Sequence, residues 1–505
     1  MSAEKTLEKF PFEDALDKTG FGLYNVLYTI LTGMVIISYV TVAFSSTILV
    51  PASACDLETT SAQQGAMVAA PVVGNVLGTL IWGYLADTRG RRRMLLVSLC
   101  LAATINGLAS ISVHWAMLMI MQFFATFMAS GQYALSMTLL SESVPRAQRN
   151  IVVLLVSSIF LLSQGIMSVL AIPILPLSFS NYLSSLDIYW NSWRTLLVVY
   201  CLPSLISAVC LFYMQESPKF VLAKGDEEAA LKILKIINRV NNGKSKEFEV
   251  KGILLESSTE VEKAAVKDQI LPLFKFPLLK PTLIISSLFI LFQMAASFMV
   301  WLPTISNQFI QTVQTGEGSD MTLCGIIASS LDAPPDPDAV PCAIDVTALL
   351  MVLGVCGLQS ITNGLLSVVV EFGGRRNTAI GVTAFCGVCG ILVNLVPNAI
   401  GSAILFAGFL LSIIVIGMYT AMCVALFPTH LRAMAVALVL SAGRIASFVF
   451  IQLTNFLLET NCELGFYLFA SFYTASALIL MLLPDDRVLL KPQITEKEEN
   501  GSARL

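Results

Sequence analysis

Charged residues are scarce in this chain of 505 residues. They make up 13% of it, whereas apolar residues make up 56% and the mean hydropathy is +0.78. A typical water-soluble domain carries about 25% charged residues. The composition therefore excludes an ordinary soluble protein and indicates one that crosses a membrane many times.

Histidine is also nearly absent, and so are the usual motifs of catalysis. Neither His114 nor His430 has a plausible catalytic partner nearby in the sequence, and no nucleophile motif, phosphate-binding loop or metal cluster occurs. We therefore expect no enzyme activity, no metal, no cofactor and no nucleic-acid partner. The Asn-x-Ser/Thr sequon occurs once, at Asn500, outside the loops expected to face outward, so the chain is expected to be unglycosylated.

Twelve apolar runs are each long enough to cross a bilayer as a helix. The first six predicted helices are Phe21–Val50, Gln63–Ala86, Arg93–Val113, Trp115–Leu140, Ile151–Leu177 and Arg194–Met214. The second six are Pro281–Ile305, Val346–Val370, Asn377–Val396, Ile400–Phe427, one that begins near Arg432, and one that ends by residue 484. A surface helix is predicted over Asp226–Val240, and Gly74 and Gly78 predict close helix packing rather than binding.

The positive charges fall almost wholly on one side of this arrangement. With these spans, 28 of the 30 lysines and arginines lie in the tails and in alternate loops; the exceptions are Arg194, where a helix enters the membrane, and Arg444, inside a helix. Such an excess marks the cytoplasmic side. Both termini are therefore predicted to be cytoplasmic.

A short basic turn lies between the second and third predicted helices. It contains Gly83, Asp87, Gly90, Arg91 and Arg92. Glycines at 83 and 90 suit the close approach and positive φ that a tight reversal needs. The pattern Gly-x-Leu-Ala-Asp-x-x-Gly-Arg-Arg resembles the cytoplasmic signature of the major facilitator superfamily. The resemblance implies an all-α membrane protein with twelve transmembrane helices in two pseudo-symmetric six-helix halves.

A weaker copy of the turn lies far downstream. Glu371, Arg375 and Arg376 repeat Asp87, Arg91 and Arg92 at an offset of 284 residues, and Arg432 repeats Arg149 at an offset of 283. Two related halves are typical of secondary transporters, in which the solute binds at their interface. The predicted parts are a tail (1–20), a first half (21–214), a linker (215–280), a second half (281–484) and a second tail (485–505).

A second signature follows the sixth predicted helix, at Glu216, Ser217 and Pro218. It resembles a segment shared by sugar porters, organic ion transporters and relatives of synaptic vesicle glycoprotein 2. Three further pairs of residues narrow the resemblance to the synaptic vesicle glycoprotein 2 branch. They are Trp193 with Arg194, Gly20 with Gly22, and Trp301 with Pro303. Its proteins carry a longer first tail and a large luminal domain between helices 7 and 8, whereas this chain has only the loop Ser306–Ala343 there.

Four of the eleven cysteines lie outside the predicted helices. Cys324 and Cys342 bound the middle of one outer loop and are the favoured disulfide pair, with Cys55 and Cys462 as alternatives in other outer loops. The remaining seven lie in apolar runs, where cysteine behaves as a small hydrophobe.

Polar residues recur at helical spacing along several predicted helices, which indicates faces turned away from lipid. Arg444 is the deepest charge: twelve residues beyond Arg432, it lies roughly 18 Å along its helix. Two roles are open for Arg444: it pairs with helix-end carbonyls or a carboxylate and orders the helix bundle, or it binds an anion. The candidate solute-binding residues are Arg444, Tyr28, Gln132, Tyr133, Gln164, Gln293, Trp301, Gln359, Asn363, Tyr419 and Gln452.

The basic turns and the helix ends near them predict a cytoplasmic gate. Its candidate residues are Asp87, Arg91, Arg92, Glu142, Arg149, Glu216, Glu371, Arg375, Arg376 and Arg432. No Asp or Glu lies in the hydrophobic interior of a predicted helix, which disfavours proton symport through a membrane carboxylate.

Together these features favour a monomeric carrier of a small anionic or zwitterionic organic solute, working by facilitated diffusion or exchange. The expected location is the plasma membrane or a secretory or synaptic vesicle membrane. The alternative is a vesicle or plasma-membrane protein that keeps the fold without transport and acts in trafficking or regulation.

Overall fold

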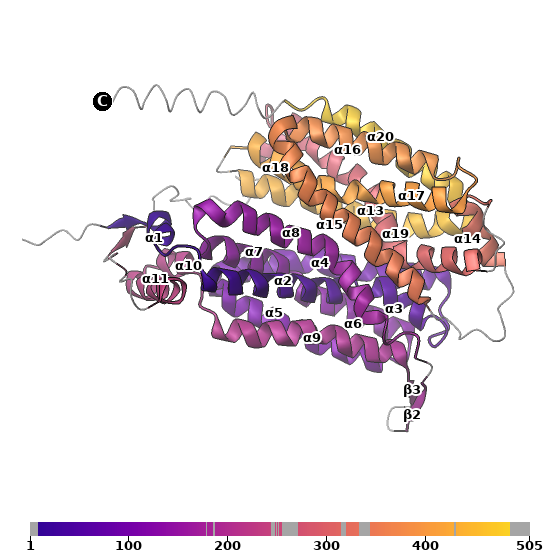
Figure 1. Ribbon diagram of the computed structural model, residues 1–505, viewed down its shortest axis with the longest axis horizontal. Coiled ribbons are helices and arrows are strands. Elements are labelled where there is room, and N and C mark those ends of the chain that lie inside the picture. Colours follow the sequence, from indigo (N-terminus) through magenta and orange to yellow (C-terminus); the bar gives the residue numbers. More distant parts are fainter. Residues whose placement is uncertain are drawn as a thin grey trace, which may run out of the picture. The chain divides into compact units, whose positions relative to one another are not determined.

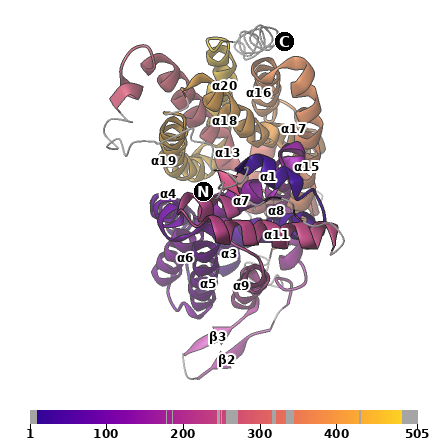
Figure 2. The same ribbon diagram turned by 90° about the vertical axis from the view of Figure 1, so that its left-hand side faces the viewer.

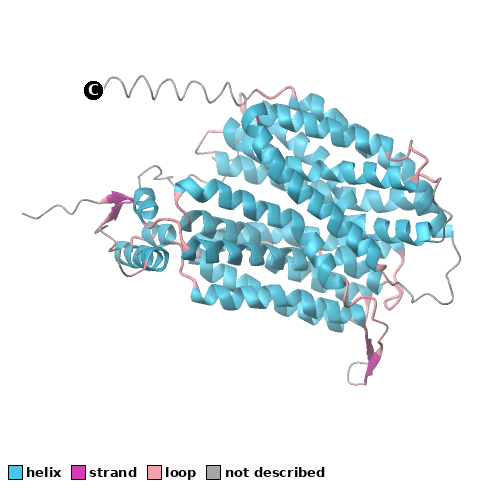
Figure 3. Ribbon diagram, in the orientation of Figure 1, coloured by secondary structure: helices cyan, strands magenta, loops and turns pink. Residues whose placement is uncertain are grey.

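The structure is a computed structural model of the whole chain. It describes residues 9–484 except 178, 185–186, 244–247, 249, 251, 255–270, 315–319, 333–343 and 429–430. Figure 3 shows that helices account for nearly all of the described chain, with two small pairs of strands.

The first part of the chain, up to the linker, is drawn from indigo to magenta in Figure 1. Its elements are β1 (Phe10–Pro11), α1 (Phe12–Lys18), α2 (Leu23–Ala43), α3 (Ser46–Ser53), α4 (Ser61–Arg89), α5 (Arg91–Leu108), the 3-10 turn η1 (Ala109–Ile111), α6 (Trp115–Ala129), α7 (Gln132–Ser143), α8 (Arg146–Ala171), β2 (Asn181–Leu183), β3 (Ile188–Trp190) and α9 (Ser192–Tyr213). The first and fourth predicted helices are thus each divided in two.

The linker and the second part follow. Their elements are α10 (Pro218–Ala223), α11 (Glu227–Asn242), β4 (Ile253–Leu254), η2 (Leu271–Phe274), α13 (Leu279–Gln314), α14 (Leu323–Asp332), α15 (Val346–Gly373), α16 (Arg375–Leu392), α17 (Ala399–Leu410), η3 (Leu411–Ile414), α18 (Val415–Leu426), α19 (Arg432–Thr460) and α20 (Cys462–Leu480). The tenth predicted helix is interrupted by the 3-10 turn η3.

Ten helical segments within the described residues are long and apolar enough to cross a membrane. Twelve were predicted. The fourth predicted span falls short because α6 and α7 are separate, and α16 is a short helix that begins with two arginines. All twelve predicted spans nevertheless correspond to helices in the structure.

The chain divides into two compact units. Unit 1 consists of Met1–Leu49 and Ala70–Glu260, and unit 2 consists of Val50–Ala69 and Val261–Leu505. In unit 1, α2 packs against α7, α8 and α9, and α5 packs against α6 and α9. In unit 2, α13 packs against α15, α19 and α20, and α16 packs against α17 and α20.

Two glycines reverse the chain at equivalent points of the two units. Gly90 separates α4 from α5 with a φ of 104°, and Gly374 separates α15 from α16 with a φ of 77°. A positive φ costs glycine little, which explains the residue type. The prediction for Gly90 is confirmed. Gly83 was expected to serve the same reversal, but it lies inside α4 and nothing within 4 Å would meet a Cβ there.

Close packing in unit 1 depends on the small residues of α4. A Cβ added at Gly74 would lie 2.4 Å from the carbonyl oxygen of Phe123, and one added at Gly78 would lie 2.3 Å from that of Phe127. The backbones of α4 and α6 therefore touch where a larger residue would force them apart. This confirms the packing interpretation of the two glycines.

Unit 2 is organised around an aromatic cluster. The ring of Phe298, on α13, lies 4.5 Å from Phe466, 5.6 Å from Phe409 and 5.9 Å from Phe469, measured between centroids. Phe298 is 1% exposed. Rings at these separations in tilted and edge-to-face arrangements contribute beyond the burial of their area, and they join α13 to α17 and α20.

The loop between the seventh and eighth predicted helices is shorter than expected. Helix α13 continues to Gln314 rather than ending near Ile305, and the unpredicted helix α14 follows. The signal for α14 was the apolar run at its start, where Leu323, Ile326 and Ile327 are each at most 2% exposed.

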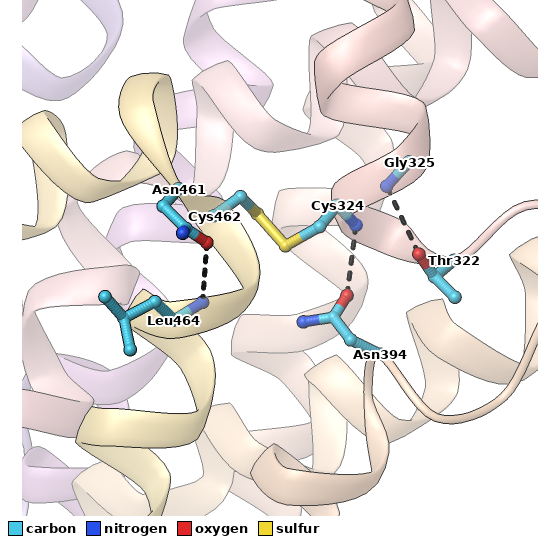
Figure 4. Close-up of a disulfide and its surroundings, with 7 residues drawn as sticks. All are labelled: Thr322, Cys324, Gly325, Asn394, Asn461, Cys462 and Leu464. Carbon is cyan, nitrogen blue, oxygen red and sulfur yellow. Dashed lines mark hydrogen bonds between the residues drawn. A yellow bond between two sulfur atoms is a disulfide. The ribbon is translucent and has the colours of Figure 1, made fainter.

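The prediction of a disulfide between Cys324 and Cys342 was wrong. Cys324 is bonded to Cys462, with the two Cα atoms 5.6 Å apart, so α14 is joined to the first residue of α20 (Figure 4). The backbone N–H of Cys324 also donates to the side-chain oxygen of Asn394 at 3.1 Å. Sequence spacing favoured a bond within one loop, whereas folding brings two different loops together. Cys55 is also disulfide-bonded, and Cys342 lies outside the described residues.

Candidate functional site

A partly buried ion pair lies at the end of unit 1 where α5, α7 and α10 meet. Arg91, at the start of α5, pairs with the carboxylate of Glu142 on α7, and the hydroxyl of Ser217 donates to the same carboxylate. The two charged side chains are 18% and 11% exposed. Asp87, by contrast, is 77% exposed and 4.0 Å from Arg91. Glu142 is therefore the principal partner of Arg91.

Glu216 and Arg92 complete this cluster at two helix ends. The carboxylate of Glu216 accepts the backbone N–H of Arg92 at 2.9 Å, so a negative charge sits at the first turn of α5, where the helix dipole favours it. The guanidinium of Arg92 donates to the carbonyls of Leu211 (3.1 Å) and Phe212 (2.6 Å) at the end of α9. These bonds give partners to one backbone N–H at the start of α5 and to two carbonyls near the end of α9, where helices leave such groups unpaired.

Unit 2 repeats one part of this arrangement. Arg376 donates to the carbonyls of Leu480 (3.3 Å) and Met481 (2.5 Å) at the end of α20. Arg375 also has a partner within the chain. The side chains of Glu371 and Arg432 lie outside those that the structure describes.

Arg149 does not join the Asp87 and Arg91 cluster, contrary to the sequence-based expectation. Its guanidinium pairs with Glu13 of α1 at 2.7 Å, and the neighbouring Arg146 pairs with Asp14 and, at 2.9 Å, with Asp17. The sequence analysis missed these acidic partners. Three carboxylates at positions 13, 14 and 17, just before the first apolar run, were the available signal.

Two candidate solute-binding residues of unit 1, Gln132 and Tyr28, are deeply buried. Gln132 is fully buried and its side-chain oxygen accepts a hydrogen bond from Ser38 at 3.2 Å. Tyr28 is 2% exposed and stacks on Tyr24, with ring centroids 5.7 Å apart. Among the described residues, no partner is found for the Tyr28 hydroxyl or for the Gln132 side-chain nitrogen.

Two further candidates of unit 1 lie on α7 and α8. Tyr133 packs edge-on against Phe160, 5.3 Å between centroids, and Gln164 is 8% exposed with a partner within the chain. Helices α2, which carries Tyr28, and α7 pack together, so unit 1 brings Tyr28 and the α7 candidates into one bundle.

In unit 2, three candidates contact neighbouring helices directly. Trp301 donates to the carbonyl of Ile451 at 3.3 Å, and Gln359 donates to that of Leu410 at 2.9 Å, where α17 gives way to η3. Tyr419 is 1% exposed and lies 3.4 Å from the hydroxyl of Thr383. These side chains therefore have a structural role in the present conformation.

The remaining candidates of unit 2 are partly exposed. Gln293, Asn363, Arg444 and Gln452 are each half-buried, and Asn363 and Arg444 have partners within the chain. Arg444 lies inside the span Met434–Thr460 of α19, as its position in the sequence predicted. Its side chain is therefore both deep along a membrane helix and partly accessible.

Ser45 and Gln122 belong to a buried polar chain that the sequence analysis did not single out. Ser45, within the break between α2 and α3, donates to Gln122 at 2.7 Å, and Gln122 donates to Asn106 at 3.0 Å. All three are at most 2% exposed. Buried polar groups of this kind are hydrogen-bonded to one another, and only the fold shows which helices they join.

The fold and the apolar spans define a multi-pass membrane protein built from two helical units. Residues 31–335 match the family described as the Major Facilitator Superfamily, and the chain belongs to that superfamily. This confirms the predicted all-α major facilitator fold.

Two curated relatives place the chain near the synaptic vesicle glycoprotein 2 branch. It is 30% identical to svop-1 of Caenorhabditis elegans over 239 residues and 26% identical to synaptic vesicle glycoprotein 2B of Homo sapiens over 231 residues. These alignments cover 47% and 46% of the chain but only 43% and 34% of the relatives, so the chain spans less than half the length of either.

Solved structures of XylE from E. coli, described as a xylose transporter, share the fold. A partially occluded inward-open structure superposes with a TM-score of 0.64 at 16% identity, covering 92% of this chain and 98% of XylE. At this identity the likeness establishes the fold alone.

Proposed function

We propose that this protein carries a small anionic or zwitterionic organic solute across a membrane by alternating access. The position of Arg444 carries the proposal. A central arginine costs roughly 2.5 to 3.5 kcal/mol to insert, and such residues face the interior of the bundle or a water-filled cavity. A transport site for an anion would explain why the charge is present despite this cost, because such a site needs a fixed positive charge at that depth.

The chemistry of the guanidinium supports an anionic group on the solute. Arginine offers five N–H donors in a planar fork and stays protonated, so it can bind a carboxylate with two parallel hydrogen bonds. Arg444 has a partner within the chain. We therefore propose that the solute binds the N–H donors of Arg444 that this partner does not use.

The other candidate residues would supply neutral contacts. Gln293, Asn363 and Gln452 are half-buried amides on α13, α15 and α19 and are suited to hydroxyl or amide groups of a solute. Tyr133 is half-buried on α7 and would contribute its hydroxyl or its ring. The other candidates are buried and would act after a local rearrangement; they are Gln132, Gln164, Tyr28, Gln359, Trp301 and Tyr419. The lack of Asp and Glu in the apolar interiors favours facilitated diffusion or exchange over carboxylate-driven proton symport.

The charged cluster of unit 1 is proposed as part of a gate on the cytoplasmic side. Arg91 and Glu142 form a partly buried pair and Glu216 sits at the first turn of α5. Pairs of this kind stabilise one of two arrangements of packed helices. We propose that they favour the outward-facing state and that Arg376 has the corresponding role in unit 2.

Location and organisation are part of the same proposal. The distribution of lysine and arginine supports cytoplasmic termini. The likeness to synaptic vesicle glycoprotein 2B supports a vesicle membrane, with the plasma membrane as the alternative. We propose a monomer in the lipid bilayer whose halves, 21–214 and 281–484, are joined by the linker 215–280.

The test is uptake into proteoliposomes of a panel of labelled organic anions, zwitterions, cations and sugars. Arg444→Ala should abolish uptake of anions, and Arg444→Lys should retain part of it. Ser441→Ala, on the same helix, is the matched control and should transport normally. Anion uptake that persists in a folded Arg444→Ala protein would contradict the assignment.

A second candidate is a vesicle or plasma-membrane protein that acts in trafficking without transport. The 26% identity to synaptic vesicle glycoprotein 2B favours it. In that case no member of the panel would move, while a pull-down from vesicle membranes would recover defined protein partners whose binding is unaffected by Arg444→Ala.

A further inference from the structure

We propose that residues 9–22, called here the N-terminal clasp, are a reversible lock that holds the first turn of α8 and the linker strand β4 on unit 1 as one body. The clasp contains β1 and α1 and ends where α2 begins. Helix α1 lies beside α11 of the same unit (Figure 2). It is separate from the Arg91–Glu142 pair and does not depend on any transported solute.

The clasp binds α8 through opposite charges. Asp14 and Asp17 both pair with Arg146, and Glu13 pairs with Arg149. Asp17 also accepts the backbone N–H of Arg146 at 2.8 Å. Because Arg146 is the first residue of α8, these contacts fix the point at which that helix begins.

The clasp binds the linker through its backbone. Strand β1 pairs in parallel with β4, and the N–H of Phe10 donates to the carbonyl of Gly252 at 3.0 Å. Lys9 pairs at 2.7 Å with Glu227, at the start of α11, and Glu227 in turn accepts the N–H of Ile253 at 2.9 Å. One carboxylate thus joins the clasp, α11 and β4.

The end of the clasp is held by the last turn of α11. Asn241 donates to the carbonyl of Gly20 at 2.8 Å and accepts the N–H of Tyr24 at 3.0 Å, while Asn242 donates to the carbonyl of Thr19 at 2.9 Å. A Cβ at Gly22 would lie 2.9 Å from the backbone of Asn241, so the approach is close.

The clasp combines a buried anchor with an exposed ionic surface. Phe12, Ala15 and Leu16 are at most 3% exposed and belong to the core of unit 1. The acidic side chains are 22% to 50% exposed. Exposed pairs are individually weak and salt-sensitive, so the ionic surface can open and close while the core of unit 1 stays intact.

Local opening of this kind is measured by hydrogen exchange of the full-length protein. In Arg146→Glu, which puts a third like charge beside Asp14 and Asp17, amides of β1, α1, β4 and the first turn of α8 should exchange roughly three- to tenfold faster together. The milder Asp17→Asn should give a smaller change in the same peptides.

Lys235→Glu is the matched control, because Lys235 lies on the exposed face of α11 and the change in charge is identical. It should leave the clasp peptides unchanged. Peptides of unit 2 should keep their protection from exchange in every variant. Unchanged protection there shows that the variant is folded.

Arg149→Glu alone should also accelerate exchange in the clasp and β4, and the charge exchange Arg149→Glu with Glu13→Arg should restore their protection, because Glu13 and Arg149 form a pair whose charges can be swapped. The proposal is overturned if acceleration in the single variants stays confined to residues 146–149, if β4 does not respond with α1, or if the charge exchange fails to restore protection. None of these readouts requires transport, so their failure would be distinct from failure of the proposed function.

Discussion

Arg92 and Arg376 make the same contact in different units. Each guanidinium donates to two consecutive backbone carbonyls at the end of a helix: residues 211 and 212 in the last turn of α9, and residues 480 and 481 where α20 ends. The arginines are 284 positions apart, whereas the carbonyls are 269 apart. The contact therefore recurs although the intervening chains differ in length.

Removing this contact in unit 2 should lower stability. Arg376→Ala leaves two carbonyls at a helix end without their donor and removes a favourable charge there, a loss of about 1–2 kcal/mol. Thermal unfolding in detergent should show a lower midpoint, and Arg376→Lys should recover part of it. Arg93→Ala, at an exposed arginine, is the control; an equal loss in both variants would contradict the helix-end role.

The two carboxylates near Arg91 should differ in importance. Glu142→Gln leaves a largely buried guanidinium without its carboxylate and should cost roughly 1–3 kcal/mol, whereas Asp87→Asn changes an exposed contact at 4.0 Å. We expect both variants to shift the population toward the inward-facing state, Glu142→Gln more strongly. A cysteine-accessibility assay in which neither variant alters labelling would refute this.

Glycines 74 and 83 should respond oppositely to the same substitution. Gly74→Ala places a Cβ against the carbonyl of Phe123 and should destabilise the protein by about 1–3 kcal/mol. Gly83→Ala meets open space inside α4 and should be neutral or stabilising by up to about 1 kcal/mol. Unfolding midpoints compare them directly, and similar losses would show that α4 and α6 do not touch as described.

The contact between Lys9 and Glu227 should weaken in acid. The hydrogen bond from Lys9 and that from the Ile253 amide hold the pKa of Glu227 below its ordinary value of 4.5. A lowered pKa stabilises the folded state fully above that ordinary value, and the stabilisation is lost as pH falls through the folded pKa. The difference in unfolding midpoint between the parent and Glu227→Gln should be constant from pH 7 to pH 5.5 and shrink below pH 4.5.

The exposed neighbour Glu228 provides the control for this titration. Glu228→Gln should differ little from the parent at any of these pH values, since no ion pair of Glu228 is found among the described residues. A Glu227→Gln difference that grows as pH falls would reverse the assigned sign.

The twelve long apolar helices could be predicted from the sequence because each needs only a local apolar run. The reversal at Gly90 could be predicted because glycine and arginine mark it locally. The breaks within the first, fourth and tenth predicted helices could not. Gly131 is tolerated in a helix, and a Cβ there would lie 2.6 Å from Trp82, so its role depends on a neighbouring helix. At the break in the tenth predicted helix, the side chain of Gln359 on α15 donates to the carbonyl of Leu410, just before η3, so this contact also comes from another helix.

Pairs of residues that lie far apart in the sequence could not be predicted either. The basic residues of the gate were identified, but Arg149 pairs with Glu13, 136 positions away, and Cys324 pairs with Cys462, 138 positions away. Spacing along the chain favours near partners, whereas α1 reaches α8 and α14 reaches α20 only in the folded units. The residue types thus predicted ion pairs and a disulfide, but only the folded structure shows which residues form them.

The Cys324–Cys462 bond also constrains how the protein can be made. Thiols join only where an oxidant is present, as in the secretory pathway or the bacterial periplasm, and stay reduced in a cytosol. A chain produced in a reducing cell-free mixture would hold α14 by noncovalent contacts such as the one from Cys324 to Asn394. Preparations for structural or uptake work should therefore be matched by their free-thiol content before their activities are compared.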